Sequence, residues 1–224
     1  MAALTPDRAG ALAPESRELL GGLAGRPWAQ EFYLAGSAAL ALYLGHRPVR
    51  GLDLMSATNR LTSPERRDLL ADLLDLDPGT TVETARDGYL YARSGAGVGL
   101  GLFHYPYPMI DPLEDLAGLP VASPADLGLM KVAAIISRGT RRDFADLRLL
   151  CRRLPLADLL ARSPEKFPHV RDFPLQALKG LADLDQAPPE PLPELAGGLG
   201  WEEIGEWVQT EVRELARARV GLTT

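Results

Sequence analysis

The sequence of 224 residues contains a single cysteine, Cys151, and aromatic residues make up only 6% of it. One cysteine excludes an internal disulfide and a zinc site made of cysteine ligands. No apolar run approaches the roughly 20 residues with which a helix spans a membrane. The first residues also lack the basic start and apolar segment that are typical of a secretory signal. These absences predict a cytoplasmic protein without a membrane segment.

The chain also lacks an excess of positive charge. Lys and Arg number 24, Asp and Glu number 30, and the net charge is -6. Proteins that bind nucleic acid over a broad surface carry a basic excess. Any contact with RNA must therefore be local. The remaining composition, 46% hydrophobic and 24% charged, is ordinary for a globular protein.

The stretch of residues 33–56, YLAGSAALALYLGHRPVRGLDLMS, predicts a phosphate-binding turn. It has the pattern of a strand end, a tight turn, a short helix over 38–44 and a second strand over 49–55. The turn contains Gly36 and Ser37, a small residue and a hydroxyl directly before a helix. Such a turn suits a phosphate, because backbone N–H groups and the positive end of the helix dipole point toward it.

The strand predicted over residues 49–55 carries one acid, Asp53, among apolar and small residues. Residues two apart on a strand point to the same face, so Gly51 and Asp53 share a face. The strand alone leaves two interpretations of Asp53 open. It is either a solvent-facing acid or a ligand of a metal ion.

A second group of motif residues lies on a helix predicted from Ser123 to Arg138, with Gly139 as its stop. Lys131 lies inside the apolar stripe of this helix. Because lysine is rarely buried without a partner, two interpretations remain. Lys131 either extends its ammonium group to the edge of the core, or it contacts a triphosphate or an acid in a cleft.

The next helix begins at Thr140, a good N-cap, and Asp143 occupies its third position. Asp143 is therefore either half of a capping pair or an acid of a functional site, and Asp146 shares its face at i+3. Arginines surround this helix, and they predict either phosphate contacts or a solvated helix face. They are Arg138, Arg141, Arg142, Arg148, Arg152 and Arg153.

The remaining local patterns predict an α+β fold. Helices are expected over residues 14–23, from 63 to the break at 77, over 201–220, and two or three times between 156 and 185. Ser63 is expected to cap the second of these helices. Strands are expected over residues 31–35, 81–85, 89–93 and 98–105, with a hairpin turn at Asp87-Gly88.

These elements divide the chain into three expected parts. An α+β core is expected over residues 1–122 and a helical region with the Lys and Asp motif over 123–186. A proline-rich linker with a C-terminal amphipathic helix is expected over 187–224.

Together, the two groups of residues resemble the nucleotidyltransferase family named after the AbiEii/AbiGii abortive-infection toxins, which has a DNA-polymerase-β-like fold. The first group matches at Gly36, Ser37, Ala39, Leu40, Leu44, Gly45, His46, Arg47, Asp53 and Ser56. The second group matches at Asp126, Leu127, Lys131, Arg138, Gly139, Arg142, Asp143, Phe144, Asp146 and Leu147. The resemblance covers approximately residues 30–150.

The resemblance implies a small mixed sheet flanked by helices and a helical C-terminal part. It also implies that a nucleotide is transferred from an NTP, with Mg²⁺, to a protein hydroxyl or to the 3′ end of an RNA such as tRNA. A cognate antitoxin protein is implied as a partner. By residue, the implied nucleotide-binding group is Gly36, Ser37, Arg47 and Lys131, and the implied catalytic group is Asp53, Lys131 and Asp143, with Asp53 as metal ligand.

One departure from the family pattern bears on catalysis. The paired acids of the family would fall at positions 51 and 53, and position 51 is Gly51. Two carboxylates two residues apart hold metal ions together, one for the attacking oxygen and one for the leaving group. The strand over 98–105 also lacks an acid. The sequence therefore leaves a second interpretation open, a catalytically impaired relative that binds a nucleotide or a protein, unless Glu83 or Asp111 replaces the missing acid.

Overall fold

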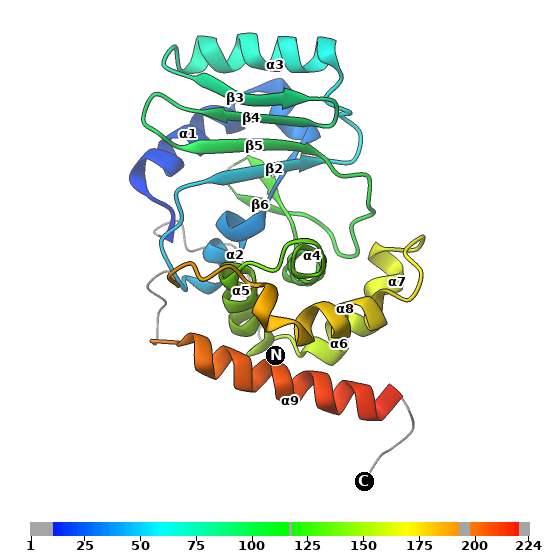
Figure 1. Ribbon diagram of the computed structural model, residues 1–224. Coiled ribbons are helices and arrows are strands. Elements are labelled where there is room, and N and C mark those ends of the chain that lie inside the picture. The colour runs from blue at the N-terminus through cyan, green and yellow to red at the C-terminus, as the bar shows by residue number, and fades with distance from the viewer. Residues whose placement is uncertain (1–10, 117, 193–197, 220–224) are drawn as a thin grey trace. The chain divides into compact units, whose positions relative to one another are not determined.

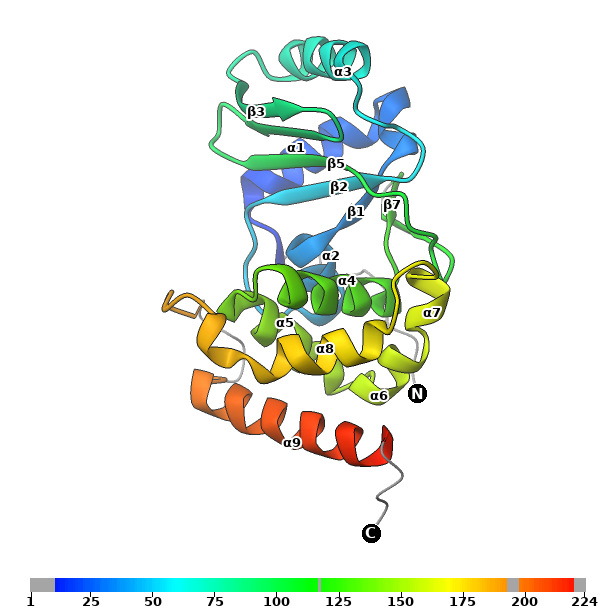
Figure 2. The ribbon, with the colours of Figure 1, turned by 45° about the vertical axis from the view of Figure 1, so that its right-hand side comes forward.

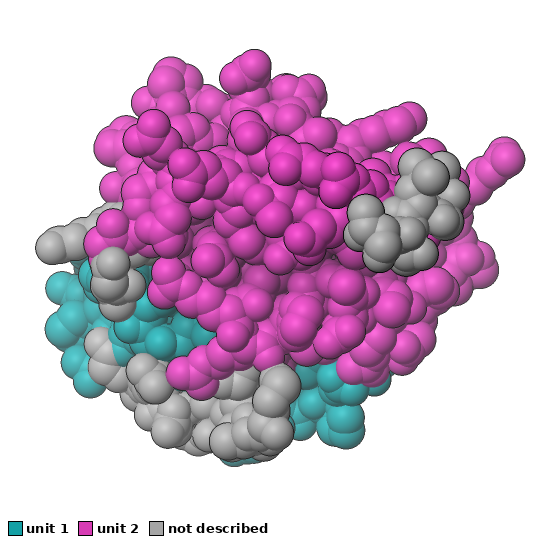
Figure 3. Space-filling model, turned by 90° about the horizontal axis from the view of Figure 1, so that it is seen from below, with its two compact units in different colours: residues 1–123 teal, residues 124–224 magenta. Residues whose placement is uncertain are grey.

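The computed structural model describes residues 11–116, 118–192 and 198–219. The chain forms two compact units, Met1–Ser123 and Pro124–Thr224, which Figure 3 colours separately. None of the helices in these described ranges combines the length and the apolar character that a membrane span requires.

The first unit contains a mixed sheet, in which the described residues form seven strands in the order β3-β4-β5-β2-β1-β7-β6 (Figure 1). β2 is parallel to β5 on one side and antiparallel to β1 on the other. β3, β4 and β5 form an antiparallel meander. The strand bounds are β1 Tyr33–Ala35, β2 Leu52–Ser56, β3 Thr81–Arg86, β4 Tyr89–Arg93, β5 Gly99–His104, β6 Glu114–Leu116 and β7 Leu119–Val121.

One face of this sheet is made of leucines that are at most 3% exposed, namely Leu34, Leu52, Leu54, Leu90, Leu100 and Leu102. Helix α1 (Pro14–Ala24) lies behind the sheet in Figures 1 and 2. Helix α3 (Ser63–Leu76) is attached to the segment after α1, because Arg26 and Trp28 donate hydrogen bonds of 2.9 and 2.7 Å to Asp72. The predicted α+β fold with a mixed sheet and flanking helices is confirmed.

Three predicted boundaries of the first unit are wrong. Residues Pro27–Glu31 form the 3-10 helix η2, so β1 begins only at Tyr33 and not at residue 31. Proline at the first position favours this helical turn. Helix α2 (Gly36–Leu44) begins two residues earlier than expected, since Gly36 adopts a φ of +61° directly after β1.

The third wrong boundary is the start of β2 at Leu52 instead of residue 49. The Val49 backbone forms hydrogen bonds of 3.0 and 2.9 Å with Ala11 and Ala13, so it is tied to the segment before α1. The expected cap of α3 also shifts by one residue. Thr62 is the N-cap, and its backbone N–H and hydroxyl both donate to the Glu65 carboxylate at 2.7 Å.

The second unit is helical in its described residues. Its helices are α4 Pro124–Ser137, α5 Arg141–Cys151, α6 Leu156–Ala161, α7 Ser163–Lys166, α8 Phe173–Ala182, the 3-10 helix η3 Leu184–Gln186 and α9 Trp201–Arg219. Helix α4 packs against α5 and α8, and α9 packs against α5 and α8 (Figure 2). Gly139, with a φ of +54°, ends α4 as the sequence predicts.

The proline-rich segment before α9 contacts its own unit. Ala187 is 7% exposed, and Glu190 forms an ion pair of 3.1 Å with Arg142. The described part of the predicted linker is therefore held against the helices. Its residues 193–197 lie outside the described ranges.

A fully buried ion pair crosses the second unit. The Lys166 ammonium on α7 donates to Asp126 Oδ1 on α4 at 2.7 Å, and both side chains are 0% exposed. Such a pair gains little over an apolar pair, but removal of one partner leaves a buried charge without its counter-ion. The pair therefore fixes α7 against the start of α4.

We predict that Lys166→Met lowers the free energy of unfolding by about 3–5 kcal/mol, because Asp126 then loses its buried cation. The double variant Lys166→Met/Asp126→Leu should recover part of that loss. The exposed Lys179→Met on α8 is the control and should change stability by less than about 0.5 kcal/mol. Urea unfolding followed by circular dichroism measures all three. Equal stability of the two lysine variants would contradict the prediction.

Candidate functional site

The register of three strands places Asp53 beside the start of helix α2. On β2, Asp53 pairs with Ala35 of β1 and with Gly101 of β5. Ala35 directly precedes Gly36, the first residue of α2. A Cβ atom at Gly36 would lie 2.5 Å from Asp53 Oδ2, and Gly36 has a positive φ of 61°. Only glycine allows this close approach of backbone and carboxylate.

The N-terminus of α2 brings the first three predicted residues together. Ser37 is the second residue of the helix and directly follows Gly36, which lies against the Asp53 carboxylate. The first N–H groups of an α-helix have no acceptor within the helix, and this end carries partial positive charge. Side by side, the carboxylate can bind a cation and the helix N–H groups can bind the phosphate that accompanies it.

Arg47 lies at the opposite end of α2 from Gly36 in the chain. It follows the C-terminal end of α2, after Gly45, which has a φ of +59°. The helix separates Arg47 from Gly36 by roughly 12 Å along its axis. The Arg47 side chain is 9% exposed.

Position 51, where the family pattern has an acid, has room for a side chain in the structure. Gly51 is exposed, and the nearest atom to a Cβ built there is the Gly99 carbonyl oxygen at 3.7 Å. Glu83 does not fill this place, because it lies on β3 and binds Arg93 at 2.5 Å. Two strands separate β3 from β2. Asp111 lies in the segment between β5 and β6.

The acids near Asp53 suit one Mg²⁺ ion better than two. Gly101, the partner of Asp53 on β5, offers no carboxylate. The described residues contain no group of three or more His, Cys, Asp or Glu side chains that would hold a metal. Mg²⁺ is commonly bound by one or two carboxylates together with substrate phosphates and water. A single carboxylate such as Asp53 can hold one such ion together with phosphate oxygens and water.

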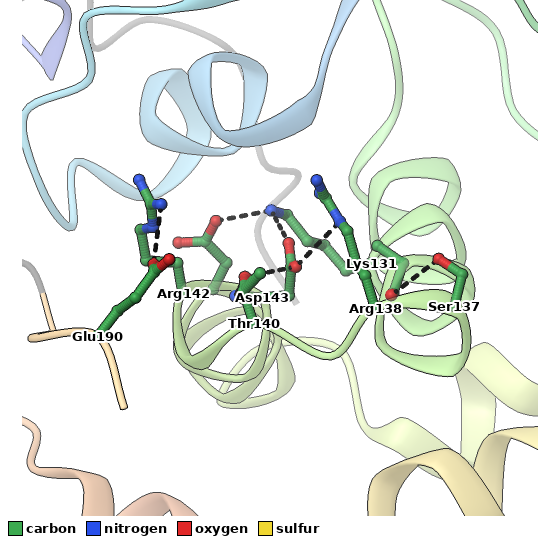
Figure 4. Close-up of polar contacts among 9 residues, drawn as sticks. Lys131, Ser137, Arg138, Thr140, Arg142, Asp143 and Glu190 are labelled. Atoms are coloured by element: carbon green, nitrogen blue, oxygen red, sulfur yellow. Dashed lines mark hydrogen bonds and ion pairs between the residues drawn. The ribbon is translucent and has the colours of Figure 1, made fainter. Parts of the chain in front are cut away.

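In the second unit, Lys131 of α4 binds two acids of α5. Its ammonium group lies 2.9 Å from Asp143 Oδ1 and 2.9 Å from Asp146 Oδ2. The exposed fractions of the side chains are 8% for Lys131, 3% for Asp143 and 0% for Asp146. Figure 4 shows the Lys131 ammonium directed at Asp143. We refer to these three residues as the buried triad.

Asp143 combines both roles that the sequence left open. Thr140 accepts a hydrogen bond of 3.3 Å from the Asp143 N–H, as an N-cap does. The Thr140 hydroxyl donates in return to Asp143 Oδ2 at 2.6 Å, while the other carboxylate oxygen binds Lys131 (Figure 4). The same aspartate thus completes the start of α5 and joins α5 to α4.

The buried triad is charged in spite of its burial. Burial lowers the pKa of Lys131, but the charges of Asp146 and Asp143 raise it more, so the pKa lies above its ordinary value. Burial raises the pKa of Asp143, but the charge of Lys131 and the Thr140 hydrogen bond outweigh it, so this pKa lies below its ordinary value.

Five of the six arginines around α5 have partners within their own unit, as expected of a helix face whose charges are balanced by neighbours. Arg141 and Arg148 lie over the rings of Trp201 and Trp207, 4.9 and 5.3 Å from their centroids. Cation–π contacts of this kind attach α9 to α5. The remaining ion pairs are Arg138–Asp143, Arg142–Glu190 and Arg152–Glu203.

Sequence reasoning omitted Asp146 from the site residues, although its i+3 spacing from Asp143 was a usable signal. The structure makes it an equal ligand of Lys131. The sequence also gave no sign that aromatic side chains of β4 and β5 share the face of Asp53. That neighbourhood follows from strand order alone.

Comparison with known proteins gives a family match and several relatives. A family model described as "Nucleotidyl transferase AbiEii toxin, Type IV TA system" matches residues 18–203. The protein aq_aa25 of Aquifex aeolicus (strain VF5) is 29% identical over 212 residues, which are 91% of this chain and 97% of that protein.

Two solved structures are similar over most of their length. JHP933 from Helicobacter pylori matches with a TM-score of 0.53 and 17% identity, covering 94% of this chain and 97% of its own. This likeness shows a shared fold. MenT4, a nucleotidyltransferase toxin from Mycobacterium tuberculosis H37Rv, matches with a TM-score of 0.48 and 17% identity, covering 95% of this chain and 96% of its own.

We predict that Gly36→Ala lowers the free energy of unfolding by about 1–2 kcal/mol, because alanine is strained at positive φ and its methyl group meets the Asp53 carboxylate. Gly51→Ala is the matched control, since a Cβ has room there, and should change stability by less than about 0.5 kcal/mol. Thermal unfolding of both variants checks this. The opposite order of stabilities would show that Gly36 tolerates a side chain.

A second prediction concerns acid stability. The pKa of Asp143 is lowered in the folded protein, so its contribution is complete well above its ordinary value of 3.8 and is lost as the pH falls through the folded pKa. Asp143→Asn should therefore cost about 2 kcal/mol at pH near 7, and the difference from the natural protein should shrink below pH 3.8.

Urea unfolding at a series of pH values measures this difference. The exposed Asp158→Asn on α6 is the control and should show no such pH dependence relative to the natural protein. A cost of Asp143→Asn that stays constant down to the acid range would contradict the lowered pKa.

Proposed function

The chain belongs to the AbiEii nucleotidyl transferase toxin family, and we propose that it transfers a nucleotide from an NTP to a hydroxyl group of an acceptor. The acceptor is the 3′ end of an RNA or a protein side chain. One observation carries this proposal, namely the Asp53 carboxylate placed against Gly36 at the N-terminus of α2. An acid and a helix N-terminus side by side suit a phosphate chain with a bound cation.

In this proposal, Gly36 and Ser37 bind the phosphates through the start of α2, and Asp53 holds one Mg²⁺ ion. The ion, when bound, offsets the charge that develops on the phosphate oxygens. Asp53 fixes the place of the phosphates relative to the sheet. Because Gly36 has no side chain, the Asp53 carboxylate lies directly against the backbone at the start of α2.

The proposed reaction is a substitution at the α-phosphorus of the NTP. The hydroxyl oxygen of the acceptor forms a bond to the α-phosphorus, and the bond between this phosphorus and the bridging oxygen breaks. Pyrophosphate leaves with the electron pair of that bond. The hydroxyl proton is released to solvent.

The buried triad is proposed as a second group that supports this function. A buried cluster of titratable groups with shifted pKa values is typical of functional sites, and Lys131 and Asp143 match the family pattern. Lys131 is already bound by two carboxylates of α5, so we propose that it holds α5 in position against α4. A contact of Lys131 with the triphosphate is the second role that we propose for it. We also propose a cognate antitoxin as a protein partner, since the family is one of type IV toxins. The cytoplasmic location remains a prediction from the sequence.

A second candidate function is favoured by Gly51. A relative without the first acid binds a nucleotide or a partner protein but does not transfer the nucleotide. In that case, nucleotide binding should be weak and insensitive to Mg²⁺, because Asp53 alone supplies the carboxylate.

We predict nucleotide transfer when the full chain is incubated with Mg²⁺, each labelled NTP in turn and total tRNA. Asp53→Ala should lower the rate by roughly 100-fold or more, since it removes the acid of the site. The exposed Asp68→Ala on α3 is the control and should retain activity. Label on the protein instead of the RNA would identify a protein hydroxyl as acceptor.

Gly51→Asp separates the two candidate functions, because the structure has room for a side chain there. Activity in the natural protein supports transfer with one carboxylate. Activity only in Gly51→Asp supports the impaired relative. Transfer that is equal in the natural protein and Asp53→Ala would refute the role of Asp53.

A further inference from the structure

The face of the sheet that carries Asp53 also carries three aromatic rings. Tyr91 of β4 is paired with Gly101 of β5, which is paired with Asp53 of β2. Tyr89 is paired with Phe103 in the same way, two residues along the strands. Directly paired residues of a sheet point to the same face. Tyr89, Tyr91 and Phe103, here called the aromatic platform, therefore lie on the face of Asp53.

Glycines beneath the rings allow the platform to lie close to the backbone. The Phe103 ring occupies the space of a side chain at Gly101, with a ring atom 2.5 Å from the position of a Cβ there. Asp53 Oδ1 is 2.9 Å from the same position. The Tyr91 hydroxyl covers Gly99 in a similar manner. The platform thus reaches the Asp53 carboxylate without a side chain between them.

The platform is only half-buried, in contrast to the opposite face. Leu90, Ala92, Leu100 and Leu102 on the leucine face are at most 3% exposed. Tyr89, Tyr91 and Phe103 each retain partial exposure. Burial raises the pKa of Tyr89, and the charges of Tyr91 and Asp53 raise it further, which agrees with a continuous surface from ring to carboxylate.

Positive charge borders the platform on the side away from Asp53. The Arg86 guanidinium of β3 lies 5.2 Å from the centroid of the Tyr89 ring. Within the described residues no carboxylate forms an ion pair with Arg86. Arg93 lies at the end of β4 and is bound by Glu83. An exposed guanidinium beside aromatic rings suits a contact with a backbone phosphate.

The ring spacing favours an unpaired strand over a duplex. The Tyr89 and Tyr91 rings are nearly parallel, at 19°, and their centroids are 6.5 Å apart. Bases of a duplex follow each other at about 3.4 Å along the axis, which is roughly half of that spacing. Single-stranded RNA has unstacked bases that stack on aromatic side chains of a sheet.

We propose that the aromatic platform binds unpaired nucleotides at the 3′ end of an acceptor RNA and directs the terminal hydroxyl toward Asp53. This inference rests on the proposed function and selects RNA as its acceptor. Bases stack on Tyr91 and Phe103, and Arg86 contacts a backbone phosphate farther from the 3′ end. The Phe103 ring of the platform covers Gly101, which is paired with Asp53 on the next strand. The last nucleotide therefore lies next to the carboxylate.

The test is RNA binding by the full chain without NTP, measured by fluorescence anisotropy with a short 5′-labelled single-stranded RNA. Tyr91→Leu and Phe103→Leu should each weaken binding by roughly 5- to 100-fold, the usual loss for one stacked base. Tyr91→Phe keeps the ring and should bind as the natural protein does. Tyr107→Leu, a half-buried tyrosine outside the platform, is the matched control and should also leave binding unchanged.

A measurement on the natural protein removes the dependence on variant folding. An RNA with a photoreactive base near its 3′ end should crosslink to the tryptic peptide of residues 87–93, which contains both tyrosines of the platform. Crosslinks confined to other peptides, or equal RNA affinity of Tyr91→Leu and the natural protein, would overturn the proposal. So would a loss of NTP affinity with unchanged RNA affinity, because the platform would then bind the base of the NTP.

Failure of this inference is distinguishable from failure of the proposed function. Ring-dependent RNA binding without any nucleotide transfer would refute the proposed reaction and leave the platform in place. Transfer to RNA without dependence on the rings would refute the platform alone.

Discussion

The close approach of Gly36 to Asp53 is the contact on which the first unit depends. It exists because β1 and β2 run antiparallel with Ala35 opposite Asp53, and because the chain turns into α2 directly after Ala35. A residue with a Cβ at position 36 would collide with the carboxylate. The helix N-terminus, the acid and the centre of the sheet are therefore fixed by one register. Any ligand that requires both a carboxylate and a helix N-terminus finds them at this point.

The second unit is held by a different kind of interaction, buried charge. Two lysines, Lys131 and Lys166, form ion pairs with acids in the interior of the helical unit. Such pairs add little net stability but strongly penalise arrangements in which a charge loses its partner. They therefore specify how α4 meets α5 and α7. On the outer side of α5, Arg141 and Arg148 lie over the rings of Trp201 and Trp207 and attach α9, so these two arginines have a structural role in the second unit.

Two positions near Asp53, Gly51 and Gly101, have no side chain that could supply a second carboxylate. This limits the chemistry that the site can support. Gly51 lacks the acid expected beside Asp53, and Gly101 offers none on the next strand. At Gly101 the vacated space is filled by the Phe103 ring. In the proposed function, a site with one acid and a flat aromatic surface relies on its substrates for the remaining charge and gains binding energy from stacking. The family membership, the single acid and the aromatic platform are consistent with one another on this basis.

The sequence by itself determined the local elements and the family. Gly45 and Gly139 end helices, Thr140 caps one, and Asp87-Gly88 turns a hairpin, because each effect acts within a few residues. It also placed Asp53, Lys131 and Asp143 in motifs, and the burial of Lys131 required a partner.

Only the tertiary structure decided which partner that was, and which residues surround Asp53. Asp143 and Asp146 both bind Lys131, since the turn at Gly139 folds α5 back onto α4. Tyr91 and Phe103 lie near Asp53 although 38 and 50 residues separate them in the sequence. The strand order β4-β5-β2 brings them together, and strand order depends on long-range pairing that no local pattern encodes.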